Sequence, residues 1–323
     1  MKPRLLVCRR VFPEVLEALS QAWDVHANQD DAVWSDAELR ARAAECEGLY
    51  VVATDRVDAA LIAACPQLRI VATGSVGFNH IDVEACSARG IAVTNTPDVL
   101  TEATADMAWA LLMATARRVT ESEHWLRAGQ WGRWAWDQFL GADVHGTTLG
   151  IVGMGRIGSA IAKRASGFSM QLLYCNRSAA ANEQALGARR VSLDELLGTA
   201  DHVVLVLPYS PQTHHLIGER ELGLMKPTAT LINIARGGIV DDVQLARALS
   251  EQRIAAAGLD VYENEPAVHP DLLKVSNIVL TPHLGSATRS SRLGMAMLAA
   301  RNLLAFAAGQ PLPSCLNANR IGR

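Results

Sequence analysis

The sequence has no apolar run long enough to cross a membrane. Its most apolar candidate helix, 107–116, contains ten uncharged residues between Asp106 and Arg117, whereas a membrane-spanning helix needs about 20. The first twelve residues carry four basic side chains around few apolar ones, which is too short an apolar core for a signal peptide. We therefore expect a soluble cytoplasmic protein with no membrane partner.

Strong charge and paired cysteines are absent as well. The net charge is −3, which gives no reason to expect binding to nucleic acid or to an anionic membrane. The six cysteines are scattered, and no two stand at C-x-x-C spacing. Disulfides and zinc ligation are therefore not expected, no metal site is predicted, and reduced thiols in a reducing compartment are the favoured interpretation.

The sequence does contain two long alternations of strand-like and helix-like segments. Half of the 323 residues are hydrophobic, and the length exceeds what one core usually fills. In the first alternation we expect strands at 5–8, 49–53, 68–73 and 91–94, with helices at 13–22, 36–46, 58–64 and 82–88. Ser35 is a plausible N-cap for the second of these helices. Such alternation predicts a parallel sheet with helices on both faces.

The second alternation begins at Thr148. We expect strands at 171–175, 202–207, 230–234, 255–259 and 277–280, and helices at 194–197 and 241–252. One long helix over 102–126 is predicted to connect the two domains, and a tail helix over 290–308 is predicted to return to the first. The predicted fold class is α/β with two doubly wound parallel-sheet domains. They are a flavodoxin-like substrate domain, 1–98 with 287–323, and a Rossmann dinucleotide-binding domain, 99–286.

A glycine motif follows the first predicted strand of the second domain. An apolar run from Thr148 is followed by Gly153, Gly155 and Gly158 at G-x-G-x-x-G spacing, and a helical pattern begins there. In this motif the first glycine permits a tight turn, the second admits a pyrophosphate, and the third lets the helix pack closely on its strand. Alone the motif often marks only a tight connection, but the strand and helix around it favour a bound dinucleotide.

The residues after the next strand indicate which dinucleotide. NAD-binding folds commonly place an acid about 20 residues past the glycines, where it binds the ribose 2′-hydroxyl. Here the segment reads Asn176-Arg177-Ser178 and contains no acid. Arg177 could bind a 2′-phosphate, with Asn176 and Ser178 as neutral partners; the alternative is that Arg177 is a solvated surface residue. We predict a preference for NADPH, with NADH as the second cofactor.

Three later strands are each followed by a side chain suited to ketone reduction. They are Arg236, Glu265 and His283, and the carboxyl ends of strands line the ligand crevice in open α/β sheets. An arginine can hold a carboxylate, histidine ordinarily titrates near neutral pH, and a neighbouring acid would orient the imidazole. Taken singly, they could be a helix-capping arginine, a solvated acid and a core histidine; together they predict reduction of a 2-keto acid.

With these residues in place, the chain resembles the D-isomer-specific 2-hydroxyacid dehydrogenase family over nearly its full length. The resemblance is strongest to the glyoxylate/hydroxypyruvate and 2-ketogluconate reductases, partly through Asn176–Ser178 and Cys315–Asn317. The motifs that carry it are Gly153–Gly158, Ala235–Gly238, Gly258–Val261 with Glu265-Pro266, Pro282-His283, Ser75–Asp82 and Thr101–Asp106.

The resemblance implies roles for individual residues. Arg236, Glu265 and His283 would form the catalytic set, and the backbone at Val76 and Gly77 would take the substrate carboxylate. The expected cofactor contacts, besides the three glycines and Asn176–Ser178, are Thr104, Arg156, Ile157, Ala235, Asp260 and Gly285. It also suggests a homodimer.

Five of the seven tryptophans lie between 109 and 136. Core or dimer packing is one interpretation of them. The other is that Trp134 or Trp136 closes the substrate pocket, across a dimer if one forms.

The predicted activity is NADPH-dependent reduction of small 2-keto acids such as glyoxylate and hydroxypyruvate, with 2-ketogluconate as a further candidate. Two alternatives stay open at this point. One is an NAD-dependent enzyme working in oxidation, of the phosphoglycerate, D-lactate, formate or phosphite type. The other is a non-enzymatic corepressor that senses the nucleotide.

Overall fold

The computed structural model describes residues 2–321 and divides into two compact units. One unit contains the chain up to Leu100 together with the part from Thr288 onward, and the other contains Thr101–Ala287. Each unit is built around one sheet, and every pair of neighbouring strands in both sheets is parallel. The predicted fold class of two parallel α/β sheets is confirmed.

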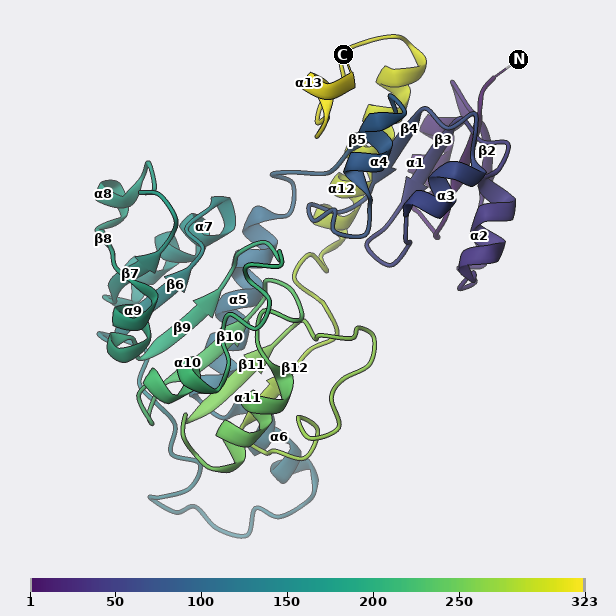
Figure 1. Cartoon of the computed structure of the whole chain (residues 1–323). Helices are drawn as coiled ribbons and strands as arrows, with labels where there is room; N and C mark the ends of the chain where they lie inside the picture. Colours follow the sequence, from purple (N-terminus) through teal and green to yellow (C-terminus); the bar gives the residue numbers. More distant parts are fainter. Residues whose placement is uncertain (1, 322–323) are drawn as a thin grey trace. The chain divides into compact units, whose positions relative to one another are not determined.

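The first unit has five strands in the order β2-β1-β3-β4-β5, which is the flavodoxin-like order. The strands are β1 Arg4–Val7, β2 Asp24–Ala27, β3 Gly48–Val51, β4 Ile70–Thr73 and β5 Ala92–Thr94. Helices α1 Pro13–Ser20 and α12 Arg289–Ala307 pack on one face of the sheet. Helices α2 Asp36–Ala43, α3 Ala59–Ala64 and α4 Val83–Ala88 pack on the other (Figure 1). The chain's last described helix is α13 Ala318–Ile321.

The second unit has seven strands in the order β12-β11-β10-β9-β6-β7-β8. Its first six strands follow the Rossmann order, and β12 extends that sheet beyond β11. The strands are β6 Thr148–Val152, β7 Gln171–Cys175, β8 Ala188–Arg190, β9 His202–Leu205, β10 Thr230–Asn233, β11 Ala256–Leu259 and β12 Ile278–Leu280.

Helices cover both faces of the second sheet as well. One face is covered by α5 Thr101–Ala116 and α7 Arg156–Ala165, which is followed by a short 3₁₀ turn, Ser166–Phe168. The other is covered by α9 Leu193–Thr199, α10 Glu219–Leu224 and α11 Asp242–Ser250. Because both faces are covered, the inner strands are buried throughout, as in β9, β10 and β11. Apart from His202, Thr230 and Asn233, the residues of these three strands are apolar, as expected of a covered parallel sheet.

Two strands were not predicted, β2 and β8, and each lies at an edge of its sheet. Their burial explains why: β2 alternates exposed and half-buried residues, and β8 is mostly exposed. An edge strand that is covered only in part needs no continuous apolar run, so neither segment carries the pattern that indicates a buried strand.

The prediction of one helix over 102–126 is wrong. The segment forms α5, which ends at Ala116, and a second helix, α6 Val119–Arg127. Between them Arg118 has a left-handed backbone with φ of +53°. The Ala116 carbonyl accepts the Ala142 N–H at 2.8 Å, and a Cβ added to Gly141 would lie 2.3 Å from the same oxygen. The helix therefore ends where a distant loop packs on its last turn.

None of the helices in residues 2–321 combines the length and apolar character that a bilayer crossing requires.

Candidate active site

The glycine motif forms the predicted strand, turn and helix. Gly153 directly follows β6 and has φ of +107°, and an added Cβ there would lie 2.5 Å from the Val206 carbonyl oxygen. A Cβ on Gly158 would lie 2.2 Å from the Gly153 oxygen, so α7 can pack against the turn only through a glycine. A Cβ on Gly155, in contrast, would meet nothing within 4 Å.

The open side of Gly155 fits a pyrophosphate. Gly155 is the N-cap of α7 and supplies no side-chain cap, so the first N–H groups of the helix have no side-chain acceptor from that residue. Free N–H groups and the helix dipole favour an anion at this position. The turn therefore has the space and the donors that a dinucleotide pyrophosphate needs.

The segment after β7 is hydrogen-bonded to the glycine turn. The Asn176 side-chain oxygen accepts the Met154 N–H at 2.7 Å, which places the Asn176–Ser178 segment beside the glycines. Arg177 and Ser178 are exposed. The nearest acid along the chain, Glu183, accepts the Tyr174 hydroxyl, and no acid occupies the segment itself.

Arg236, Glu265 and His283 follow the ends of β10, β11 and β12, which are neighbours in the sheet. The structure brings the acid and the histidine together: His283 Nδ1 lies 2.7 Å from Glu265 Oε2. Glu265 Oε1 accepts the Tyr262 N–H at 3.0 Å. The two side chains are 42% and 33% exposed, so the pair is reachable from solvent. Because Nδ1 points to the carboxylate, Nε2 is the atom that can exchange a proton with a substrate.

The charges around Glu265 keep it ionised. Burial raises its pKa, but the hydrogen bond and charge of His283, the Tyr262 N–H and the Arg236 charge outweigh burial, so the net pKa lies below the usual value. Burial lowers the pKa of Arg236, and the Glu265 charge opposes that change. An arginine remains a cation after such a shift. The site therefore presents a fixed anion behind the imidazole and a cation next to it.

Two glycines set the position of Arg236. A Cβ on Gly237 would lie 1.6 Å from the Tyr262 carbonyl oxygen, so the Arg236 loop runs directly against the loop that carries Glu265. Gly238 has φ of +76°, which favours glycine. Asn233 closes the turn, because its side chain accepts from the Ala235 N–H and donates to the Arg236 carbonyl.

Asp260 organises the histidine loop. It is buried, and its carboxylate accepts the Leu284 and Gly285 N–H groups at 2.7 Å each, together with the Thr281 hydroxyl. A Cβ on Gly285 would lie 3.3 Å from Asp260 and 3.5 Å from Thr104. Three of the residues predicted to contact the cofactor, Thr104, Asp260 and Gly285, therefore lie together. The hydrogen bonds of Asp260 also hold the loop that carries His283, whose φ is +54°.

Sequence reasoning missed a histidine cluster beside Gly238. His215 Nε2 lies 3.1 Å from Glu263 Oε1, and its Nδ1 lies 3.6 Å from an Asp241 oxygen. His214 stacks on His215 with ring centroids 3.9 Å apart. Among the described residues, His214, His215 and Glu263 each offer one possible metal-ligand atom, and these atoms lie within 4.8 Å of one another, but Glu263 already contacts His215. The His215 contacts instead join the loops that carry Arg236 and Glu265.

The Ser75–Gly77 loop of the first unit has a one-sided pattern of hydrogen bonds. Its three carbonyls accept from the Thr96 N–H, the Asn95 side chain and the Ser75 hydroxyl. Within the described hydrogen bonds, none uses the N–H of Val76 or Gly77. A loop with engaged carbonyls and unengaged N–H groups is suited to an anion.

The tryptophans between 109 and 136 differ in burial. Trp109 is buried and stacks on Phe168 at 4.6 Å, which is core packing. Trp134 and Trp136 meet edge to face at 4.7 Å, yet they are 62% and 86% exposed. Core packing within this chain therefore does not account for these two side chains.

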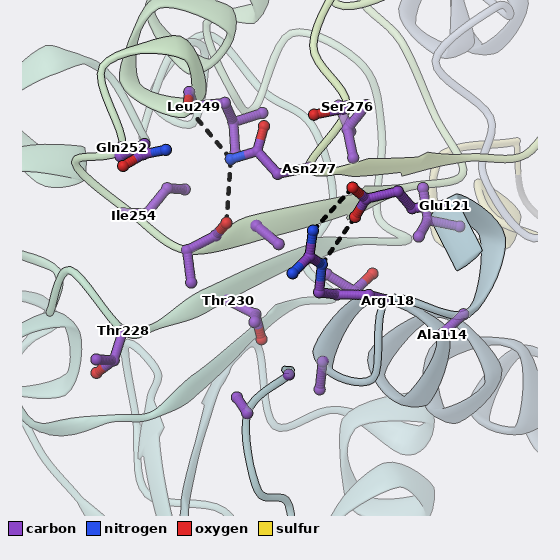
Figure 2. Close-up of a pocket in the computed structure, with 18 of the residues that line it drawn as sticks. Ala114, Arg118, Glu121, Thr228, Thr230, Leu249, Gln252, Ile254, Ser276 and Asn277 are labelled. Atoms are coloured by element: carbon purple, nitrogen blue, oxygen red, sulfur yellow. Dashed lines mark hydrogen bonds and ion pairs between the residues drawn. The ribbon is translucent and has the colours of Figure 1, made fainter. Parts of the chain in front are cut away.

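A cavity of about 1040 Å³ lies at the amino ends of strands in the second sheet, and Figure 2 shows residues that line it. It is lined by the first residues of strands, such as His202 and Thr230, whereas the catalytic candidates follow strand carboxyl ends. Figure 2 shows the Arg118–Glu121 ion pair on one side and Asn277 on another. Asn277 donates to the Leu249 and Ala255 carbonyls. The cavity and the candidate catalytic side chains therefore lie at opposite ends of the strands of this sheet.

The chain is similar to known proteins over nearly its whole length. Residues 109–285 match the family described as D-isomer specific 2-hydroxyacid dehydrogenase, NAD binding domain. A glyoxylate reductase of Thermococcus onnurineus is 47% identical over 322 residues, which cover 98% of this chain and 96% of the relative. A glyoxylate reductase of Aeropyrum pernix is 49% identical over 329 residues, with the same coverage.

The chain is also similar to a solved structure. It is an NADPH-dependent glyoxylate/hydroxypyruvate reductase from Sinorhizobium meliloti in complex with NADP and malonate. The two folds superpose with a TM-score of 0.86 at 36% identity, covering 98% of this chain and 97% of the other.

Proposed function

Because the chain belongs to the D-isomer-specific 2-hydroxyacid dehydrogenases, which are NAD(P)-dependent enzymes, we propose that it reduces small 2-keto acids to D-2-hydroxy acids with NADPH. Glyoxylate and hydroxypyruvate are the proposed substrates, and 2-ketogluconate is a longer candidate. The observation that carries the proposal is the 2.7 Å contact between His283 and Glu265. These two residues follow β12 and β11, and Arg236 follows the neighbouring strand β10. The names of the similar glyoxylate reductases support it.

The proposed chemistry divides among three side chains. A bound nicotinamide supplies a hydride to the carbonyl carbon. Arg236 holds the substrate carboxylate through its guanidinium fork and polarises the adjacent carbonyl. His283 donates a proton from Nε2 to the carbonyl oxygen, while Nδ1 keeps its hydrogen bond to Glu265. The Glu265 carboxylate stabilises the imidazolium before the transfer and fixes the ring afterwards.

The NADPH preference is supported by Arg177 and by the absence of an acid between Asn176 and Ser178. The NADP bound to the Sinorhizobium relative also supports it. Replacing Arg177 with aspartate should lower the ratio of kcat/KM for NADPH over NADH, since a carboxylate repels a 2′-phosphate. An unchanged ratio would show that Arg177 does not select the cofactor.

One spectrophotometric experiment tests the activity. Loss of reduced nicotinamide absorbance is followed with NADPH or NADH against glyoxylate, hydroxypyruvate, pyruvate and 2-ketogluconate. We expect turnover with the small acids, faster with NADPH, and a D-configured product where the product is chiral. Tight nucleotide binding without turnover on any of the four acids would favour the corepressor alternative.

We also propose that the protein is a cytoplasmic homodimer. The exposure of Trp134 and Trp136 supports an interface on the segment that carries them, since large exposed apolar groups mark binding surfaces. All six cysteines are free, which supports a reducing compartment. Alanine replacement at both tryptophans, followed by light scattering and measurement of KM, separates an interface role from a pocket role.

A further inference from the structure

Arg190 is the last residue of β8, the edge strand beside β7. Its guanidinium reaches the backbone of the segment that follows β7. Nε and Nη2 donate to the Asn176 carbonyl at 3.2 and 3.0 Å, and Nη2 also donates to the Arg177 carbonyl at 2.7 Å. Within residues 2–321, Arg190 takes part in none of the described ion pairs. Its side chain is thus committed to two successive peptide carbonyls.

These contacts immobilise the segment from both sides. The Asn176 side chain is held by the glycine turn through the Met154 N–H, and the Asn176 carbonyl is held by Arg190. Because consecutive carbonyls are fixed, the peptide planes on both sides of Arg177 are fixed as well. Arg177 and Ser178 are therefore presented from a backbone that is already ordered, which lowers the entropy lost when they bind a ligand.

The same contacts change the local charge. A peptide carbonyl carries partial negative charge, and two of them near a dianionic phosphate would oppose its binding. The Arg190 guanidinium faces both carbonyl oxygens, and none of the described ion pairs joins it to a carboxylate. The result is a second positive charge beside the segment that carries Arg177.

We propose that Arg190 is a positioning residue that sets the preference for a ribose bearing a 2′-phosphate. The inference rests on the proposed NADPH preference and adds to it a residue outside the Asn176–Ser178 segment. Arg190 acts in two ways: it clamps the backbone that presents Arg177, and it offsets the charge of the two carbonyls.

Arg189 provides a matched control. It is the same residue type, one position earlier on the same exposed strand. Its guanidinium binds Glu195 at 2.7 Å and makes no described contact with the Asn176–Ser178 segment. Replacing Arg189 with alanine removes the same side chain and the same formal charge but leaves the clamp intact.

The experiment measures binding of 2′,5′-ADP and 5′-AMP by calorimetry, which needs no turnover. Arg190→Ala should weaken binding of 2′,5′-ADP about tenfold and binding of 5′-AMP by less than threefold. The loosened backbone would weaken about one charge-assisted hydrogen bond from Arg177 to the 2′-phosphate, which is worth about that factor. Arg190→Lys keeps the charge but not the fork, so we expect an intermediate loss. Arg189→Ala should keep the wild-type ratio.

A double variant tests whether Arg190 acts through Arg177. If the clamp serves Arg177, Arg177→Ala with Arg190→Ala should lose less than the product of the single losses. Thermal unfolding of each variant checks that the fold is retained. Full selectivity in Arg190→Lys would refute the clamp and leave only the charge.

The outcomes also distinguish a failure of the Arg190 inference from a failure of the proposed NADPH preference. If the wild-type protein binds both nucleotides equally, the NADPH preference and the role of Arg190 fail together. If the wild type prefers 2′,5′-ADP and Arg190→Ala retains that preference, only the role of Arg190 is refuted.

Discussion

Replacing Gly155 with alanine should remove cofactor binding while leaving the fold almost unchanged. The backbone at Gly155 is extended, with φ of −87°, which alanine adopts without strain. The added Cβ meets no atom within 4 Å. The remaining cost is that alanine is a poorer N-cap than glycine, which is worth about 1 kcal/mol or less.

The expected loss of binding is much larger. The Cβ would occupy the open side of the turn, so a pyrophosphate would have to move away from the N–H groups of α7. Weakening one or two charge-assisted hydrogen bonds, at about 1.5–3 kcal/mol each, corresponds to a rise in Kd of about 100-fold.

Gly158→Ala is the contrasting variant. Its Cβ would lie 2.2 Å from the Gly153 oxygen and 3.3 Å from a Val206 methyl carbon. Either α7 or the turn must then move by about 1 Å to reach an ordinary contact distance, and overpacking of this kind costs about 1–3 kcal/mol. This variant should lose both stability and binding.

The two properties are measured separately. Chemical denaturation gives the free energy of unfolding, and titration of NADPH fluorescence gives Kd. An alanine at Gly155 that binds NADPH within threefold of wild type would show that the open side of Gly155 does not receive the pyrophosphate. A large loss of stability in that variant would show that the space around Gly155 is not open.

Three further predictions concern the catalytic pair and the tail. His283→Gln should lower kcat by about a hundred- to ten-thousand-fold with Kd for NADPH unchanged; near-normal turnover would refute the proton-donor role. Glu265 has a lowered pKa and stays ionised, and its carboxylate orients the His283 ring through Nδ1. Glu265→Gln should therefore lower kcat for reduction about a hundredfold with Kd for NADPH unchanged, and an unchanged kcat would contradict the pairing. Buried Asn317 binds the Val93 N–H, the Ile91 carbonyl and the Ser87 hydroxyl, so Asn317→Ala should reduce the free energy of unfolding by about 2–4 kcal/mol, whereas exposed Asn319→Ala should change it little; equal losses would refute this assignment.

Most inner strands and the glycine turn were predictable because their signals are local. A strand buried on both faces is mostly apolar, as in β9 and the strands beside it, and a turn that meets a phosphate has glycines at fixed spacing. The edge strands β2 and β8 escaped prediction because solvent imposes no such pattern on them. The break at Arg118 escaped it because the loop at Ala142, distant in sequence, ends the helix.

The sequence by itself determined which chemical groups follow which strands: Arg236, Glu265 and His283, each placed after an apolar run. Only the tertiary structure decided that the acid meets the histidine at 2.7 Å, that Gly237 runs against Tyr262, and that Arg190 clamps the segment after β7. The physical reason is that these contacts join neighbouring strands of a parallel sheet. Such strands are separated along the chain by whole crossover connections, so no local pattern encodes the contacts between their ends.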